Sequence, residues 1–514
     1  MSTAAIELKN ITKTFGEVVA NKNVCLTVNR GEILSILGEN GSGKTTLMNM
    51  ISGIYFPDHG SIYIGGEEVM IRSPKDAFRY KIGMIHQHFK LVDVFTAAEN
   101  IVLGAEDAHR FNMKKSARKI GEISRQYGFD INPNKKIYEM SISEKQTVEI
   151  IKVLYRGADI LILDEPTAVL TPQETQKLFR ILRRMREDGK AIIIITHKLR
   201  EVLSLSDRVS VLRKGEYIGT VKTSETNEAQ LTEMMVGEKV SLNIDRSDPV
   251  NPQERLEVRG LNCVSPDGVK LLDNVSFTVR SGEILGVAGI AGSGQRELLE
   301  AIAGLQHLDS GEIVYLDPAT GKSESLRDKT PVQIRDLGVR LSFVPEDRLG
   351  MGLVGNMDIV DNMMLRSYQR GKSVFLQRKA PKDLAEDIID RLQVVTPGAN
   401  TPVRRLSGGN VQKVLVGREI AAAPTVLMVA YPARGLDINS SYMIYNLLNE
   451  QKKNGVAVIF VGEDLDVLME LCDRIMVVSS GVVTGVVEGR EATKEELGLL
   501  MIKEDEDGNE RWRI

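Results

Sequence analysis

The fold is decided by the stretch Gly38-Glu39-Asn40-Gly41-Ser42-Gly43-Lys44-Thr45-Thr46. It matches the pattern G-x-x-x-x-G-K-[ST] and lies between an apolar run typical of a buried strand, 32–37, and a helical segment, 44–52. Glycines let such a loop turn its backbone N–H groups inward at the positive end of a helix, where they bind an anion. Lys44 can reach the β- and γ-phosphates of a nucleotide, and the Thr45 hydroxyl can ligate Mg²⁺. The stretch predicts a phosphate-binding loop, and the alternative is a glycine-rich turn without a ligand.

Further polar residues follow two predicted strands of the same domain. Asp164 and Glu165 come directly after the apolar run 160–163, and carboxylates at the end of a buried strand are costly unless they serve a cation or a reaction. We predict that Asp164 holds Mg²⁺ and that Glu165 polarises the water that attacks the γ-phosphate. His197 follows the run 192–195, a position that suits a γ-phosphate sensor. Gln87 either contacts Mg²⁺ or the attacking water, or is an ordinary polar residue.

The chain is one unit written twice. Gly31-Glu32-Ile33-Leu34 returns as Gly282-Glu283-Ile284-Leu285 at an offset of 251, and Asp207-Arg208-Val209 returns as Asp473-Arg474-Ile475 at 266. Each copy alternates short β-rich runs with helical segments, which indicates an α/β domain with a mainly parallel sheet. The region from about 95 to 155 is helical in pattern and indicates an inserted helical subdomain. We predict a first domain at 1–243, a linker at 244–254, a second domain at 255–502 and a charged tail at 503–514.

Composition excludes several classes of protein. The 514 residues carry a formal net charge of −4, which argues against broad electrostatic attraction to nucleic acid. No apolar stretch approaches the roughly 18 residues that span a bilayer, and no secretory signal opens the sequence. Three widely separated cysteines fit reduced thiols and not a disulfide or zinc framework. A secreted, membrane-spanning or fibrous protein is therefore not expected.

With Leu406-Ser407-Gly408-Gly409-Asn410 in the second copy, these motifs resemble the nucleotide-binding subunits of the ATP-binding cassette (ABC) superfamily, over essentially the whole chain. The resemblance implies two tandem ABC-type P-loop NTPase domains, each with a mainly parallel core, an antiparallel β part and a helical subdomain. It implies ATP and Mg²⁺ as cofactors, ATPase activity, and head-to-tail pairing in which the signature of one domain closes over the ATP of the other. The implied catalytic residues are Glu165, His197 and Gln87, and the implied metal ligands are Thr45, Gln87 and Asp164. The implied nucleotide contacts are Phe15 on the adenine, Gly38, Asn40, Gly41, Ser42, Gly43, Lys44, Thr45 and Thr46 on the phosphates, and Ser407, Gly408 and Gly409 of the signature.

The second copy departs from this pattern at each chemical position. Its loop runs from Gly289 to Gly294 and continues with Gln295 and Arg296, so that Gln295 stands where Lys44 stands. The other replacements are Ala430 for Asp164, Tyr431 for Glu165, Glu463 for His197, Glu346 for Gln87 and Pro266 for Phe15. The signature of the first copy is eroded as well, since Ser141 is followed by Ile142, Ser143 and Glu144. With head-to-tail pairing, the intact loop faces the intact signature, which predicts one hydrolytic site and one degenerate site.

Three stretches narrow the resemblance to the ATPases of bacterial simple-sugar importers, with the nucleoside branch most similar. They are 86–92 (HQHFKLV), 165–171 (EPTAVLT) and 344–348 (VPEDR). The resemblance implies uptake of a nucleoside or simple sugar through two integral membrane permease subunits, with a substrate-binding lipoprotein or periplasmic protein in the same system. It implies a peripheral location at the cytoplasmic face of the membrane, membrane contact through the permease only, and no nucleic acid partner. Residues 88–98 would receive the permease, and a plain surface connection is the alternative.

Two other classes remain to be weighed. A tandem-cassette ATPase acting on ribosomes in translation also lacks a membrane span, but two intact sites and a long charged helical linker would be expected of it. The basic segment 114–119 could bind RNA, although a solvated helix face is the simpler interpretation. A purely regulatory or structural module conflicts with the complete set of Lys44, Asp164, Glu165 and His197.

Overall fold

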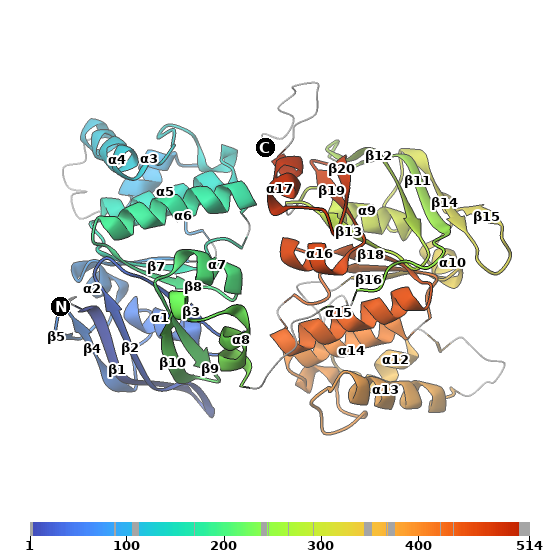
Figure 1. The fold of residues 1–514 in the computed structure, drawn as a ribbon, viewed down its shortest axis with the longest axis horizontal. Coiled ribbons are helices and arrows are strands. Elements are labelled where there is room, and N and C mark those ends of the chain that lie inside the picture. Colours follow the sequence, from blue (N-terminus) through green and yellow to red (C-terminus); the bar gives the residue numbers. More distant parts are fainter. Residues whose placement is uncertain are drawn as a thin grey trace. The chain divides into compact units, whose positions relative to one another are not determined.

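The computed structural model describes residues 4–86, 89–104, 113–168, 170–237, 244, 246–265, 267–290, 292–343, 352–365, 367–368, 376–421, 423–434 and 436–502. The chain forms two compact units, and the division between them falls between residues 241 and 242. Figure 1 shows the helices and strands of each unit.

The centre of the first unit is a parallel sheet whose strands are mainly apolar. Its strands are β3 (Ile33–Leu37), β6 (Ile82–Ile85), β7 (Ile160–Asp164), β8 (Ala191–Ile195) and β9 (Arg208–Arg213). They lie in the order β9-β3-β8-β7-β6, and all the pairs are parallel. Every residue of β3, β7 and β8 is buried, as expected for a parallel sheet covered on both faces. Because these strands run in one direction, the segments that follow β3, β7 and β8 meet at one edge of the sheet.

An antiparallel part adjoins this core. It contains β1 (Ala4–Phe15), β2 (Val18–Asn29), β4 (His59–Ile64), β5 (Glu67–Val69) and β10 (Glu216–Lys222). β1 pairs with β2 and β4, and β10 pairs with β9, all antiparallel. A single parallel bridge between Glu216 and Lys22 joins β10 to β2, so that all ten strands form one sheet.

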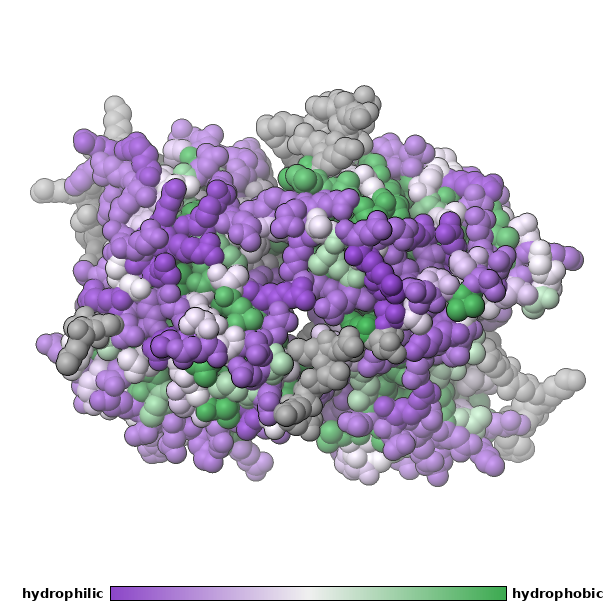
Figure 2. All heavy atoms as spheres, in the orientation of Figure 1, coloured by the Kyte–Doolittle hydropathy of each residue, from purple (hydrophilic) through white to green (hydrophobic). Residues whose placement is uncertain are grey.

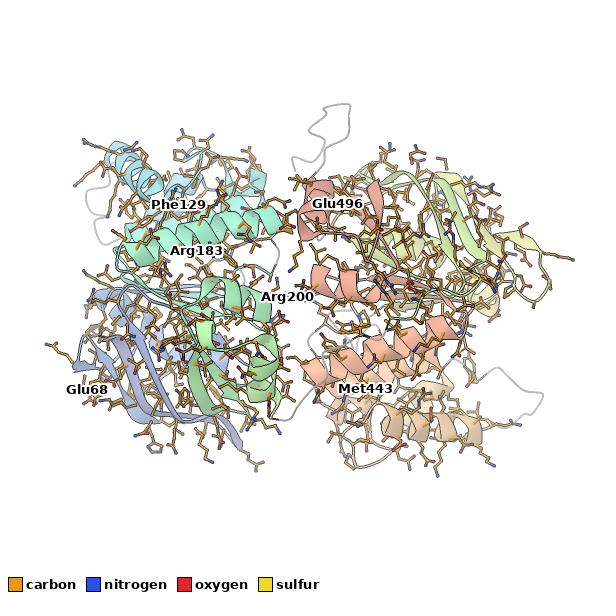
Figure 3. All side chains as sticks on the ribbon, in the orientation of Figure 1. Glu68, Phe129, Arg183, Arg200, Met443 and Glu496 are labelled. Atoms are coloured by element: carbon orange, nitrogen blue, oxygen red, sulfur yellow. The ribbon has the colours of Figure 1, made fainter. Side chains whose placement is uncertain are left out.

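The helices of the first unit cover the sheet and form a separate helical part. They are α1 (Lys44–Ile51), α2 (Pro74–Arg79), α3 (Ala97–Val102), α4 (Met113–Tyr127), α5 (Ile142–Tyr155), α6 (Pro172–Glu187), α7 (Leu199–Leu205) and α8 (Glu228–Val236). Helices α3, α4 and α5 gather on one side of the sheet (Figure 1). Phe129, labelled in Figure 3, packs edge to face against Tyr127 in their apolar core. The predicted helical subdomain is therefore present.

The second unit repeats this architecture with its sheet in two pieces. The six-stranded piece has the order β16-β17-β18-β13-β19-β20, and the four-stranded piece has the order β12-β11-β14-β15. The strands are β11 (Glu254–Val264), β12 (Lys270–Arg280), β13 (Ile284–Ala288), β14 (Ser310–Leu316), β15 (Ser323–Ser325), β16 (Val339–Phe343), β17 (Val426–Ala430), β18 (Ala457–Val461), β19 (Arg474–Ser479) and β20 (Val482–Glu488). The helices are α9 (Gln295–Ile302), α10 (Pro331–Asp336), α12 (Ile359–Met364), α13 (Lys379–Arg391), α14 (Gly408–Ile420), α15 (Ile438–Lys453), α16 (Leu465–Leu471) and α17 (Lys494–Ile502).

The described part of the predicted linker packs on the second unit. Arg246 donates to the backbone oxygens of Met469 and Cys472, and Lys452 donates to the backbone oxygen of Ser247. Arg490 forms an ion pair with Asp248. These contacts hold the segment against the ends of α16 and β20.

The hydropathy of the surface is that of an ordinary globular protein, as the amino-acid composition predicts. Hydrophilic side chains predominate on the face shown in Figure 2, and hydrophobic side chains occur there in small groups. Within the described ranges, no helix combines the length and the apolar character that crossing a membrane requires.

Candidate nucleotide-binding site

The predicted phosphate loop connects β3 to α1 and is fixed by its glycines. Gly43 has a φ of +93° and directly precedes α1. A Cβ atom there would lie 2.3 Å from the backbone oxygen of Ala20, so no larger residue fits without moving the loop. Asn21 is fully buried and donates from Nδ2 to the backbone oxygen of Gly43 at 3.2 Å. The pattern of the loop did not indicate Asn21, because the contact depends on how β2 passes the loop.

Lys44 is buried at the start of α1, and its ammonium group covers the carbonyl groups of the loop. Its Nζ donates to the backbone oxygens of Gly38 at 2.6 Å and Glu39 at 2.9 Å. Burial lowers the pKa of Lys44, and the nearby carboxylates of Glu165 and Asp164 oppose that shift. The lysine is therefore held where its charge acts on both the loop and the carboxylates.

Asp164 ends β7 and faces the first turn of α1. Thr45 Oγ1 donates to Asp164 Oδ2 at 3.5 Å. Burial, and then the adjacent Glu165, raise the pKa of Asp164 to about 6, while Lys44 and Thr45 act in the opposite direction. A hydroxyl and a carboxylate are oxygen donors of the kind that Mg²⁺ prefers, and such sites are normally completed by nucleotide phosphates and water. The described residues contain no group of three or more histidine, cysteine or acidic side chains that could hold a metal ion.

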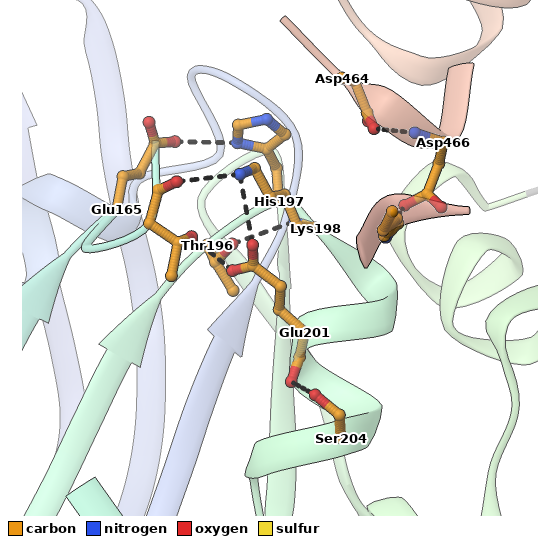
Figure 4. A network of polar contacts seen from close by, with 10 residues as sticks. Glu165, Thr196, His197, Lys198, Glu201, Ser204, Asp464 and Asp466 are labelled. Atoms are coloured by element: carbon orange, nitrogen blue, oxygen red, sulfur yellow. Dashed lines mark hydrogen bonds and ion pairs between the residues drawn. The ribbon is translucent and has the colours of Figure 1, made fainter. Parts of the chain in front are cut away.

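Glu165 and His197 are in direct contact. The distance between His197 Nδ1 and Glu165 Oε1 is 2.9 Å (Figure 4). This hydrogen bond is the main reason that the pKa of Glu165 is lowered, and burial opposes it. Glu165 has a φ of +46°, which is unusual for a residue with a side chain, and its N–H donates to the backbone oxygen of Ile195 at 2.9 Å. The backbone of Glu165 is in a strained conformation that is fixed by the neighbouring strand, and its carboxylate is fixed by His197. A carboxylate held in this way is a suitable base for an attacking water.

Phe15 lies at the end of β1, next to the turn into β2. Its ring is 44% exposed and packs edge to face on Tyr55, with the centroids 5.2 Å apart. Asp58 fixes the strand end, because it accepts bonds from Thr14 N at 2.7 Å and from Lys13 Nζ at 2.8 Å. An exposed aromatic face on a fixed strand end can stack on a base. Sequence reasoning missed Tyr55 and Asp58, which carry no motif.

The corresponding positions of the second unit keep the backbone and change the chemistry. Tyr431 has a φ of +53°, and its N–H donates to the backbone oxygen of Val461 at 2.9 Å. The Arg434 guanidinium lies 5.9 Å from the Tyr431 ring, and its Nε lies 3.6 Å from Glu463 Oε1. Gln295 donates to the backbone oxygen of Ile290 at 3.1 Å, so an amide replaces the charged Lys44. A tyrosine and a glutamate thus occupy the places of the carboxylate–histidine pair, and Arg434 lies beside both.

The two signature segments each begin a helix but leave different charges at its start. Ser407 caps α14, and its Oγ accepts from Asn410 Nδ2 at 2.9 Å. No acidic residue lies in the first turn of α14. Ser141 caps α5 in a capping box, in which Ser141 N donates to Glu144 Oε2 at 2.7 Å, and Lys135 binds the same carboxylate at 2.8 Å. The start of α5 therefore carries its own anion, whereas the start of α14 can accept one.

Several predicted positions lie outside the described residues. They are Gln87, His88, Pro266, the segment 344–348 with Glu346, and the tail 503–514.

A phosphate loop between a buried strand and a helix, with carboxylates at the end of another strand of the same parallel sheet, defines a P-loop nucleotide-binding protein. The family model described as ABC transporter matches residues 21–168 and 272–432. The chain therefore belongs to the ABC transporter family and is an ATPase of that family. The predicted family, the two tandem cassette domains and the ATPase activity are confirmed.

Relatives in the same family match almost the full chain. The guanosine import ATP-binding protein NupO of Bacillus subtilis (strain 168) is 42% identical and covers 96% of this chain and 97% of its own. The nucleoside import ATP-binding protein NupA of Lactococcus lactis subsp. cremoris (strain MG1363) is 40% identical and covers 97% of this chain and 98% of its own. The ribose import ATP-binding protein RbsA 2 of Escherichia coli O157:H7 is 38% identical over 97% of each chain.

A solved structure supports the tandem fold. The archaeal ribosome recycling factor aABCE1, solved in complex with the ribosomal stalk protein aP1, aligns over 91% of this chain and 87% of its own with a TM-score of 0.59. At 18% identity, this likeness establishes the fold alone.

Proposed function

We propose that this chain is the ATPase subunit of an importer for nucleosides or simple sugars. The proposal is supported by the names of the relatives, which are import ATP-binding proteins for guanosine, nucleosides and ribose at about 40% identity over nearly the full chain. A nucleoside is the first substrate to test, because relatives at 42% and 40% identity are named as guanosine and nucleoside import ATP-binding proteins.

The partners follow from this role. Two integral membrane permease subunits would form the pathway, and a substrate-binding lipoprotein or periplasmic protein would deliver the substrate. The chain would lie at the cytoplasmic face of the membrane and touch the membrane only through the permease. In the first unit, the exposed apolar side chains Val92, Val94 and Phe95 lie in the segment proposed to receive the permease.

The first unit would carry out hydrolysis. Glu165 would take the proton of the attacking water, and His197 would hold the Glu165 carboxylate and contact the γ-phosphate. Lys44 would turn from the loop carbonyls to the β- and γ-phosphates, and Thr45 and Asp164 would hold Mg²⁺, which neutralises charge on the phosphates. The observation that carries the proposal is the 2.9 Å contact between His197 and Glu165. His197 follows β8, which is adjacent to the phosphate loop's strand β3, and Glu165 follows the next strand, β7.

The second unit would contribute a signature but no turnover. We propose that Ser407, Gly408 and Gly409 complete the ATP site of the first unit, because the start of α14 has no anion of its own. The degenerate site would combine Gln295 and Tyr431 with the eroded signature at Ser141. Glu144 supports this division, since its carboxylate already accepts the Ser141 N–H at the start of α5, which a phosphate would otherwise bind.

The test is a pair of substitutions in the full chain. Glu165→Gln should reduce steady-state ATPase activity by about 10²–10⁴-fold, the range for loss of a general base. Tyr431→Phe should leave activity within about twofold. Substantial turnover in the Glu165→Gln protein would show that hydrolysis does not depend on this base.

The importer role is tested separately from the chemistry. The chain should co-purify with two integral membrane proteins and not with ribosomes, and uptake by cells carrying the system should respond to nucleosides more than to pentoses. Co-purification with ribosomes would favour the translation ATPase instead.

A further inference from the structure

A group of three polar residues, of which Thr167 is buried and the other two are partly exposed, joins the loop after β7 to the loop after β8. Thr167 is 2% exposed, and its Oγ1 donates to Glu201 Oε2 at 2.5 Å. Lys198 Nζ donates to the backbone oxygen of Thr167 at 3.2 Å. It also forms an ion pair with Glu201 Oε1 at 3.2 Å (Figure 4). These three residues, called the Thr167 triangle below, therefore hold each other through both a side-chain and a backbone atom of Thr167.

The triangle is placed next to both members of the carboxylate–histidine pair. Thr167 follows Glu165 by two residues, and Lys198 directly follows His197. Lys198 is fixed at its backbone as well, because its N–H donates to Thr196 Oγ1 at 3.1 Å. Glu201 lies in the first turn of α7, so the triangle also ties both loops to that helix. Because only one or two peptide bonds separate the triangle from Glu165 and His197, the triangle limits how far these two side chains can move.

The second unit offers an internal comparison. At the offset of 266, Thr167 corresponds to Ala433, Lys198 to Asp464 and Glu201 to Val467. Ala433 lacks the hydroxyl of Thr167, Asp464 has a negative charge in place of the Lys198 cation, and Val467 lacks the carboxylate of Glu201. The triangle therefore cannot form in the second unit. Tyr431 nevertheless keeps a φ of +53°, close to the +46° of Glu165. The backbone conformation therefore does not need the triangle, and a role in folding of this loop does not explain it.

We propose that Thr167, Lys198 and Glu201 are positioning residues that fix the Glu165 carboxylate relative to the His197 imidazole during ATP hydrolysis. The proposal rests on the proposed function, in which Glu165 acts as the base. Reacting groups must be held within about 0.5 Å, and a misplacement of about 1 Å can cost about 10²-fold in rate. The triangle is absent from the unit that lacks the base, as expected for residues that serve the base.

The test compares variants of the full chain that differ in one polar group. Thr167→Val removes the hydroxyl with little change in shape, and Lys198→Met removes the cation from a side chain that is one-third exposed. We expect kcat for ATP to fall by about 10–100-fold in each, while KM and the affinity for a fluorescent ATP analogue change by less than about twofold. Thr167→Ser keeps the hydroxyl and should restore kcat to within about threefold of the unmodified chain.

A matched control lies at the equivalent place in the second unit. Asp464 caps α16 by accepting from Asp466 N at 2.9 Å, and Asp464→Ala should leave kcat within about twofold. Melting temperatures of all the variants identify any that fail to fold, and Lys198→Met serves where Thr167→Val does not fold.

Double substitution separates this proposal from the function it rests on. In a Glu165→Gln background, adding Thr167→Val should cause no further loss of residual activity, because both changes act through one group. A further loss of 10-fold or more would overturn the proposal and leave the base assignment intact. Equal kcat in Thr167→Val, Lys198→Met and the unmodified chain would also overturn it. Full turnover in Glu165→Gln alone would overturn both.

Discussion

Replacing Gly43 with alanine should damage the phosphate loop more than the same change at Gly41. Its φ of +93° costs a residue with a side chain about 1–2 kcal/mol. In addition, the new Cβ would lie 2.3 Å from the Ala20 backbone oxygen and 2.6 Å from Asn21 Nδ2. Ordinary contact begins at 3.4 Å, so the loop and β2 must separate by about 1 Å. Since the neighbours include backbone, the loop itself has to move.

Gly41 supplies the control for this prediction. Its φ is +81°, but a Cβ there meets no protein atom within 4 Å. Gly41→Ala therefore carries the backbone cost without the clash, and we expect a loss of ATP affinity of about 5–30-fold, which corresponds to about 1–2 kcal/mol. Gly43→Ala should lose at least about 100-fold, because displacement of the anion nest by about 1 Å adds to that cost.

The assay is titration of each variant with a fluorescent ATP analogue, followed by steady-state ATPase activity at saturating ATP. Thermal unfolding should show that both variants remain folded, since the change is confined to one loop. If Gly43→Ala bound ATP within about fivefold of the unmodified chain, the close approach of β2 would not be what fixes the loop.

Three further predictions concern the adenine side and the thiols. Phe15→Ala should weaken ATP binding by about 5–100-fold, as expected for loss of about 1–3 kcal/mol of base stacking, whereas Phe15→Tyr should bind within a few-fold, both measured by titration. Bonds from Lys13 and then Thr14 lower the pKa of Asp58 from 3.8 to about 2, so its contribution to stability is present above pH 3.8 and is lost as the pH falls towards 2. Denaturant unfolding between pH 5 and pH 2 should show this loss in the unmodified chain and less of it in Asp58→Asn. Cys25 is exposed and Cys263 is buried with its pKa raised to about 11, so a thiol reagent should modify Cys25 quickly and Cys263 only after unfolding.

Much of the fold could be predicted because its signals are local. The apolar runs 32–37 and 160–163 correspond to β3 and β7, and the helix expected at 44–52 is observed as Lys44–Ile51. A buried parallel strand is a short run of branched apolar residues, and a phosphate loop has a fixed spacing of glycines. These patterns need no knowledge of distant residues.

The supporting residues of the site could not be predicted for the opposite reason. Asn21 reaches Gly43 only because the β1–β2 hairpin crosses the loop, and Asp58 reaches Thr14 across 44 residues of sequence. The contact between Thr167 and Glu201 likewise depends on α7 returning to the end of β7. Such contacts arise from strand register and helix placement. A single asparagine, aspartate or threonine belongs to no sequence pattern from which these contacts could be predicted.

The left-handed backbone conformation that Tyr431 shares with Glu165 bears on the redesign of the molecule. The two units keep one backbone conformation at this position although their side chains differ. To obtain an enzyme with two hydrolytic centres, the side chains of the second unit would therefore have to be replaced, but its main chain would not have to be rebuilt at this position. The second unit thus has a backbone on which a second hydrolytic centre could be built.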